Sequence, residues 1–410
     1  MIEWNEQQQQ IQSMIRRFVE TEIAPKLEKY EFGDHPPYDA LRKMGKIFGL
    51  DELARARFNA KIGRHAADAD DRGDRDTRSR SPDQIANDMA MQILMVMELS
   101  RYSPGMVTAL GVSMGLTANA IMARGTERQK RDYALPLMTL EKIGSWAITE
   151  PGSGSDAFGS MKSVARRDGN GGYVLNGSKT FITNGPYADT IVFICKLDED
   201  NDPADRKILS FILDKDLAGL TRSKPLRKMG LHSSPTGELF LEDVYATRDH
   251  LLGGSEEAQS REGAKTTFST ERTGVAAMAL GIVEQCCTLC IDYARTRVQF
   301  GRPIGEFQLI QLKLAKMEVA RMNIQNLVFR QIEMAGEGKS MTLAEASACK
   351  LYSAQAAMEV CLEAVQLFGG NGYMAEYQVE QLCRDAKVLQ IYGGTDEIQI
   401  SQIARDLMKT

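Results

Sequence analysis

The chain has 410 residues, of which 43% are hydrophobic and 26% are charged, and its formal net charge is -5. This length allows two or three compact units, and the composition is that of an ordinary globular protein. The small acidic balance gives no electrostatic reason to expect nucleic acid or an anionic membrane as the main partner. No apolar run looks long enough to span a bilayer. The first ten residues lack the basic and apolar regions of a secretory signal, so we expect a cytoplasmic protein.

The cysteines and histidines give no sign of a disulfide framework or a metal site. The seven cysteines are odd in number and lie mostly in apolar, helix-like contexts. Such cysteines are most simply free, buried thiols of a reduced compartment. The four histidines do not have the spacing of metal ligands, so we expect no metal.

The amino-terminal third is predicted to be helical, with one interruption. A helical pattern of apolar residues runs over 7–50. Acidic and arginine residues then alternate over 68–83 with almost nothing apolar, which favours a solvated loop over a partner-docking loop. The helical pattern resumes at Gln84 and continues through the methionine-rich segment MQILMVMELS.

The pattern changes at Trp146, where short alternating segments predict strands. Residues 163–185 are expected to form two or three strands, and Asn176-Gly177 within them is typical of a hairpin turn. Further strands are predicted for LSFILDKD and GELFLEDVYA, with the strand region ending near Gly253 or Gly254.

From about residue 257 to the end, nearly every segment has a helical pattern. Two long helices are predicted over 268–297 and 307–335, and LFGGNGYM is a glycine-rich break. This helical, β, helical order excludes the usual dinucleotide fold, which needs alternating strands and helices. A dinucleotide that binds here must bind by another route.

The segment WAITEPGSGSD joins an extended apolar run to a turn with two glycines and two serines. Such a turn can present backbone N–H groups and hydroxyls to an anion, because glycine lets the backbone approach closely. A plain surface loop would explain the same residues.

Five ordered motifs resemble those of the acyl-CoA dehydrogenase family: TEPGSGSD with the following FITNG, KMGLHSSPTGELFLEDVYA, RTRVQFGRPIGEFQ, QLFGGNGY and IYGGTDEIQ. The helical lead-in GTERQKRDYALP also matches, and only the charged segment falls outside the resemblance. The resemblance implies an α+β fold with an amino-terminal helical domain over 1–145, a central β-barrel or sandwich domain over 146–255 and a carboxy-terminal four-helix bundle over 256–410. It also implies FAD, a homotetramer and electron-transfer flavoprotein as the electron acceptor.

The resemblance assigns flavin contacts to particular positions. Phe181 would pack against the isoalloxazine ring, where many relatives carry tryptophan, so the apolar face is kept and the indole donor is lost. Thr183 would lie near flavin N5. Residues 297–308 and 366–370 would reach the FAD of a neighbouring subunit. The implied cofactor-binding residues are Trp146, Ile148, Thr149, Gly154, Ser155, Phe181, Thr183, Arg297, Phe300, Gln308, Gln366, Gly369, Gly370, Thr395 and Glu397.

The implied reaction is α,β-desaturation of an acyl-CoA thioester. The α-C–H is a very weak acid, so a positioned carboxylate must remove its proton, and fixed donors must stabilise charge on the thioester oxygen. Most relatives carry this base as the glutamate of IYEGT, where the present chain has Gly393. The backbone N–H of Gly393 can still serve the thioester carbonyl.

A minority of the family, resembling isovaleryl-CoA and long-chain acyl-CoA dehydrogenases, carries the base earlier as a glutamate followed by arginine. The segment FSTERTGVAA places Glu271 and Arg272 there, so we predict Glu271 as the base. The alternative for Glu271 is a solvated helix residue, and Glu397 is a weaker candidate base. The implied substrate contacts are Ser155, Ser269, Arg272 and Gly394.

The acyl chain is not readable from the sequence. The family would build its pocket from helices near 91–122 and from the start of the Glu271 helix, and the early glutamate favours branched or longer chains by analogy. The alternatives are a flavin oxidase or monooxygenase of the same fold on a non-CoA substrate, a non-catalytic flavin- or nucleic-acid-binding relative, and an inactive subunit of a mixed assembly. A glutamate at position 271 argues against the first.

Overall fold

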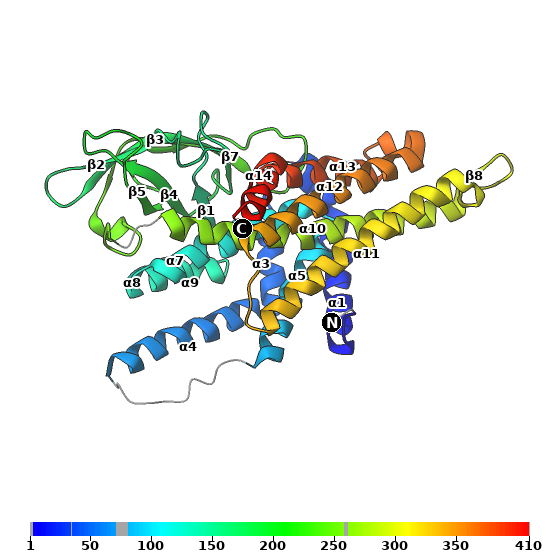
Figure 1. Cartoon of the computed structure of the whole chain (residues 1–410), viewed down its shortest axis with the longest axis horizontal. Helices are drawn as coiled ribbons and strands as arrows, with labels where there is room; N and C mark the ends of the chain where they lie inside the picture. Colours follow the sequence, from blue (N-terminus) through cyan, green and yellow to red (C-terminus); the bar gives the residue numbers. More distant parts are fainter. Residues whose placement is uncertain (1–2, 34, 71–80, 258–260, 410) are drawn as a thin grey trace.

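The structure is a computed structural model that describes residues 3–33, 35–70, 81–257 and 261–409, and their side chains except those of 61–70 and 261–270. Helices come first, strands second and helices again third (Figure 1). Two helical regions therefore flank a central mixed sheet, and the α+β class predicted from the sequence is confirmed.

The amino-terminal helices are more broken than the sequence pattern predicts. The segment 7–50 forms several short pieces, and a separate long helix that was not predicted follows it and projects from the body in Figure 1. The elements are α1 (Glu6–Phe18), η1 (Val19–Ile23), η2 (Ala24–Lys26), α2 (Leu27–Phe32), α3 (Tyr38–Ile47), α4 (Leu50–Asp70), α5 (Pro82–Ser100), α6 (Pro104–Leu110), η3 (Gly111–Ala118), α7 (Asn119–Arg124), α8 (Glu127–Gln129), η4 (Lys130–Ala134) and α9 (Leu135–Met138).

Local sequence accounts for the start of α5. Ser81 accepts a hydrogen bond from the backbone of Gln84, whose side chain accepts one from the Ser81 N–H in return, and Pro82 follows the cap. The predicted charged loop over 68–83 is thus wrong at both ends, because α4 extends to Asp70 and α5 begins at Pro82. Its middle, 71–80, lies outside the described residues.

Seven strands form one mixed sheet in the order β1-β4-β2-β3-β7-β6, with β5 paired to β4. Every residue of β4 is buried, which places this strand, unnoticed in the sequence, at the centre of the β core. The strands are β1 (Gly144–Ala147), β2 (Val164–Arg167), β3 (Tyr173–Thr183), β4 (Thr190–Leu197), β5 (Ile208–Asp214), β6 (Leu220–Arg222) and β7 (Thr236–Ala246), followed by η5 (Arg248–His250).

The predicted hairpin turn at Asn176-Gly177 is wrong. Both residues lie inside β3, at a register shift against β7, and the turn that joins β2 to β3 lies at 168–172 instead. The glycine is needed for a close approach, since a Cβ at Gly177 would lie 2.2 Å from the hydroxyl oxygen of Ser163. The asparagine exchanges hydrogen bonds with Asp243 across the sheet. A bulge has the same local residues as a tight turn.

Long helices dominate the carboxy-terminal region, where α10, α11 and α12 pack on one another around a shared apolar core, and α10 and α11 also pack on α5 (Figure 1). A short hairpin joins α10 to α11 at the far end of the molecule from the sheet. The elements are α10 (Arg261–Thr296), β8 (Val298–Gln299), β9 (Arg302–Pro303), η6 (Ile304–Glu306), α11 (Gln308–Gly336), α12 (Leu343–Phe368), η7 (Gly369–Tyr373), α13 (Gln378–Lys387), η8 (Val388–Gln390) and α14 (Asp396–Leu407).

Two stretches, Pro104–Arg124 and Glu271–Thr296, are long and apolar enough to cross a membrane by length and composition. The expectation that no run has this length is therefore wrong. Half of the first window and 72% of the second are buried inside the fold, and core helices pass the same test. Packing against neighbouring helices explains their hydropathy. Six of the seven free cysteines are buried too, as predicted.

Candidate active site

Glu271 and Gly393 lie against each other, although they are far apart in sequence. Glu271 projects from α10, and Gly393 lies in the turn that precedes α14. A Cβ added at Gly393 would lie 3.5 Å from the carboxyl carbon of Glu271 and 3.6 Å from its Oε1. The carboxyl group from α10 therefore faces the position from which a side chain at residue 393 would extend.

The surroundings of Glu271 change its protonation. Burial raises the pKa of this carboxyl to about 7, against the charges of Arg272 and Lys350, which lower it. A carboxyl group with this pKa can take up and release a proton near neutral pH. The reading of Glu271 as an ordinary solvated helix residue is therefore wrong, because its side chain is partly buried and faces another element.

Arg272 points into the protein. Its side chain is buried, and its Nη1 donates a hydrogen bond of 3.0 Å to the hydroxyl of Ser347 in α12. Burial lowers the pKa of this guanidinium, and Glu271 raises it. Its Nη2 is 3.7 Å from the position of a Cβ at Gly394, which places Arg272 behind the same turn. Ser269 lies in α10, with its side chain outside the described residues.

The turn beside Glu271 is held by donors from two helices. The buried amide of Gln399 donates to the carbonyls of Gly393 and Gly394, at 3.0 and 2.8 Å. The buried Lys350 ammonium donates to Gly394 O at 2.9 Å and lies 3.5 Å from Oδ1 of Asp396. Within the described part of the chain, the N–H of Gly393 donates no hydrogen bond. It is therefore free to meet an external acceptor.

Sequence reasoning missed Lys350, Gln399 and Asp396. One signal for the lysine was present, because Lys350 is the single basic residue in the small-residue segment EASACKLYSAQAA of a helix. Two predicted residues lie at the start of α14: Thr395 caps the helix, and Glu397 is exposed in its first turn. Hydrogen bonds to its own backbone N–H and to the Thr395 hydroxyl lower the pKa of Glu397. An exposed carboxyl of lowered pKa is a weaker base than Glu271.

The sheet presents a second group of predicted residues. Phe181 is 68% exposed and has a left-handed backbone with φ of 57°, at an irregularity in the pairing of β3 with β7. Strained backbone has a free-energy cost, so an exposed aromatic ring at such a position makes Phe181 a candidate for contact with a ligand. Thr183 is partly buried beside it, whereas the side chains of Trp146 and Ile148 are buried in the core.

Buried hydrogen bonds and an ion pair hold the base of the glycine-rich loop after β1. The Glu150 carboxylate accepts from the N–H groups of Lys162 and Ser163 and pairs with the buried Lys179 ammonium at 2.8 Å. Thr149 is partly buried, and the loop tip with Gly154 and Ser155 is exposed. A Cβ at Gly154 would meet nothing within 4 Å, which leaves open space over the loop.

The remaining predicted flavin contacts lie elsewhere. Arg297, Phe300 and Gln308 are exposed around the β8–β9 hairpin, which Figure 1 places at the opposite end of the molecule from the sheet. Phe300 is 94% exposed with φ of 52°. The end of α12 and the following turn expose Gln366, Gly369 and Gly370. One chain alone therefore does not bring all the predicted contacts together.

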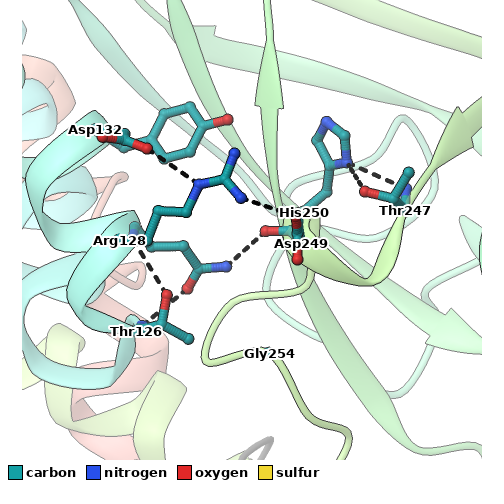
Figure 2. A pocket seen from close by; sticks show the side chains of 9 residues that line it. Thr126, Arg128, Asp132, Thr247, Asp249, His250 and Gly254 are labelled. Carbon is teal, nitrogen blue, oxygen red and sulfur yellow. Dashed lines mark hydrogen bonds and ion pairs between the residues drawn. The ribbon is translucent and has the colours of Figure 1, made fainter.

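A separate polar cleft of about 310 Å³ lies between α8 and the segment after β7 (Figure 2). Figure 2 shows Arg128 bridging Asp132 and Asp249, with His250 bound to Thr247. Its lining contains none of the predicted site residues. We therefore do not include it in the candidate active site.

Comparisons with known proteins identify the family of the chain. Family models for acyl-CoA dehydrogenase match in three parts, the N-terminal domain at 85–141, the middle domain at 145–244 and the C-terminal domain at 262–408. The chain is 41% identical to a short-chain specific acyl-CoA dehydrogenase of Megasphaera elsdenii, over 76% of this chain and 80% of that one. It is 36% identical to an acyl-CoA dehydrogenase of Bacillus subtilis over 98% of both chains.

Solved structures show the same likeness over the full length. An acyl-CoA dehydrogenase from Geobacillus kaustophilus superposes with a TM-score of 0.85 at 31% identity, covering 98% of both chains. Butyryl-CoA dehydrogenase from Megasphaera elsdenii superposes with a TM-score of 0.82 at 33% identity, covering 100% of both. Family models, full-length relatives and fold all agree: the chain belongs to the acyl-CoA dehydrogenase family of flavoprotein oxidoreductases.

Proposed function

We propose that Glu271 removes the α-proton of an acyl-CoA thioester in an α,β-desaturation. The observation that carries this proposal is that the Glu271 carboxyl carbon lies 3.5 Å from the position of a Cβ at Gly393, at the turn where most of the family carries its base. A carboxylate that reaches the same space from α10 can act on the same substrate carbon. Its pKa of about 7 leaves about half of it ready to accept a proton at neutral pH.

The turn supplies the complementary donor. Proton removal builds negative charge on the thioester oxygen, and a fixed donor that faces this oxygen stabilises that charge. The N–H of Gly393 has no acceptor in the described chain, and the carbonyls on its far side are tied to Gln399 and Lys350. Gly393 would therefore serve as the oxyanion donor, with Gly394, Arg272, Ser155 and Ser269 as further substrate contacts.

The exposed groups around the sheet fit FAD. The ring of Phe181 offers a flat apolar face, and the open glycine positions allow a bulky ligand to approach the loop that contains Gly154. FAD, when bound, supplies the acceptor for the β-hydride at its N5. Thr149, Ser155 and Thr183 would hold the flavin from the sheet side, with Thr395 and Glu397 closing the site.

A second copy of the chain would complete the cofactor site. The exposed hairpin with Phe300 and the exposed glycines at the end of α12 lie far from the sheet of their own chain (Figure 1). Contacts from these residues to FAD require a neighbouring subunit, and a homotetramer supplies one. Electron-transfer flavoprotein as acceptor and a cytoplasmic location rest on the sequence alone and stay predictions.

Anaerobic bleaching of the flavin by a panel of straight and branched acyl-CoAs, including butyryl-CoA and isovaleryl-CoA, tests the proposal. The unaltered enzyme should bleach with at least one of them. Glu271→Gln should keep its fold and FAD yet lose about 10²- to 10⁴-fold in rate, the usual contribution of a positioned base. Glu337→Gln, on the exposed turn after α11, is the matched control and should behave like the unaltered enzyme.

Two outcomes would contradict this function. A Glu271→Gln variant that still bleaches rapidly would remove the base from position 271, and Glu397→Gln would then test the second carboxyl. Flavin turnover with oxygen and without any acyl-CoA would favour the alternative, an oxidase or monooxygenase on a non-CoA substrate.

A further inference from the structure

Lys350 is a charged side chain with no exposure to solvent, in the amino-terminal half of α12. Burial of an ammonium group is costly unless it is paired and hydrogen-bonded. Lys350 has two partners, the Gly394 carbonyl at 2.9 Å and the Asp396 carboxylate at 3.5 Å. Both belong to the segment that contains Gly393, so the buried charge is directed at the proposed active site.

The turn at Gly393 and Gly394 needs such a tie. Both glycines have left-handed backbones, with φ of 61° and 90°, and glycine has more accessible conformations than any other residue. Lys350 and Gln399 hold the Gly394 carbonyl from α12 and α14, and Gln399 also holds the Gly393 carbonyl. These bonds fix the orientation of the peptide units beside the free N–H of Gly393.

Lys350 also acts on Glu271 through its charge. The charged or titratable groups around the Glu271 carboxyl in the described part of the chain are Arg272 on α10, Lys350 on α12 and Tyr392 in the turn, with Asp396 of α14 behind the lysine. The two cations lower the pKa of Glu271 against the effect of burial. Asp396 partly offsets the positive charge of Lys350, and its other oxygen is bound by Gln355 and Gln390.

We propose that Lys350 is a positioning residue for the desaturation: it fixes the Gly393–Gly394 turn through the Gly394 carbonyl and places a positive charge beside the Glu271 carboxylate. This inference rests on the proposed role of Glu271. Lys350 acts through these two neighbours rather than on the substrate. Its substitution should therefore change both the limiting rate and the pH at which the rate rises.

The experiment compares Lys350→Gln, Lys350→Arg and the control Lys339→Met, an exposed lysine at the turn between α11 and α12. Anaerobic flavin bleaching by butyryl-CoA and isovaleryl-CoA is followed from pH 5.5 to 9. Lys350→Gln should raise the midpoint of the rate increase by up to about one pH unit, since a nearby positive charge lowers the pKa of a carboxyl. Its limiting rate at high pH should fall by up to about 10²-fold, because the turn is displaced.

The charge-keeping variant separates electrostatics from packing. Lys350→Arg should retain the midpoint while its limiting rate falls, and Lys339→Met should change neither. A Lys350→Gln enzyme with full FAD content and an unmoved midpoint would overturn the proposal and leave Lys350 as a structural residue only.

Asp396→Asn provides an independent test, because it should move the midpoint of the rate increase in the opposite direction. This variant can still be measured if Lys350→Gln does not fold. Removal of the negative charge beside Lys350 should lower the midpoint, and an unmoved or raised midpoint would overturn the proposal. Thermal unfolding across the same pH range gives a second readout, in which the pH dependence contributed by Glu271 should shift with these midpoints. A rapid Glu271→Gln enzyme would instead refute the base assignment, so the two failures are distinguishable.

Discussion

The proton-handling part of the site and the cofactor surface are built in different ways. At the turn before α14, one chain supplies the carboxyl of Glu271, the free N–H of Gly393 and the buried donors that hold the carbonyls of the turn. At the sheet and the β8–β9 hairpin, one chain supplies exposed aromatic rings and open glycine positions.

This difference follows from what each part must do. A base and an oxyanion donor must be placed within a fraction of an ångström before substrate arrives, so buried helices hold them. A surface for a large cofactor needs open approach, and the ligand itself covers the exposed groups. The first part should therefore respond to small changes within one chain, whereas parts of the second should respond only when cofactor and partner subunit are present.

Relocation of the base gives the largest expected effect. Glu271→Gly should lower the bleaching rate by about 10²- to 10⁴-fold. Addition of Gly393→Glu to this variant should raise the bleaching rate at least about ten-fold, because a side chain at 393 begins 3.5 Å from the position that the Glu271 carboxyl occupied. Rates are measured by stopped-flow bleaching with straight and branched acyl-CoAs. If the rate does not recover, a carboxyl at position 393 does not reach the place that the carboxyl at position 271 has in the active enzyme.

Loss of the buried cation under the glycine-rich loop should have the next largest effect. Lys179→Met leaves the buried Glu150 carboxylate without its cation, which typically costs about 3–5 kcal/mol of unfolding free energy. Urea denaturation of the apoprotein measures this loss, and equilibrium dialysis measures the expected weakening of FAD binding. The double variant Lys179→Met, Glu150→Gln should recover part of the stability. An unchanged FAD affinity would show that the glycine-rich loop after β1 does not take part in cofactor binding.

The pH dependence of the unaltered enzyme should show a smaller change. With a Glu271 pKa of about 7, the deprotonated fraction and the bleaching rate should rise about ten-fold between about pH 6 and pH 8. Because the folded-state pKa is raised above the ordinary value of 4.5, the contribution of Glu271 to stability is present at low pH and is lost as pH rises through 7. If the rate rises instead with a midpoint near pH 4.5, the Glu271 carboxyl is exposed to water in the active enzyme.

Truncation of the exposed hairpin ring should affect the single chain least. Phe300→Ala removes a side chain that is 94% exposed, so the unfolding free energy of the apoprotein should change by no more than about 0.5 kcal/mol. FAD content and the oligomer measured by size-exclusion chromatography should fall if this ring meets the cofactor of a neighbouring subunit. Unaltered FAD content and assembly would leave the hairpin outside the cofactor site.

The sequence by itself determined the order of helical, β and helical regions, the long helices of the carboxy-terminal part and the family. The sequence can predict these features because periodicity and motifs are patterns within short segments of the chain. The pairing of an early glutamate with Gly393 also came from motifs, as a hypothesis that the short distance from the Glu271 carboxyl to the position of a Cβ at Gly393 supports.

Only the tertiary structure decided which distant residues meet. Asn176-Gly177 has the residues of a hairpin turn, yet contact with Ser163 and pairing with Asp243 place it inside a strand. Lys350 looks in sequence like a charge on a helix surface, but the packing of α12 against α14 removes it from water and turns it toward Gly394. Burial and charge pairing depend on the sum of long-range contacts, which no local pattern contains.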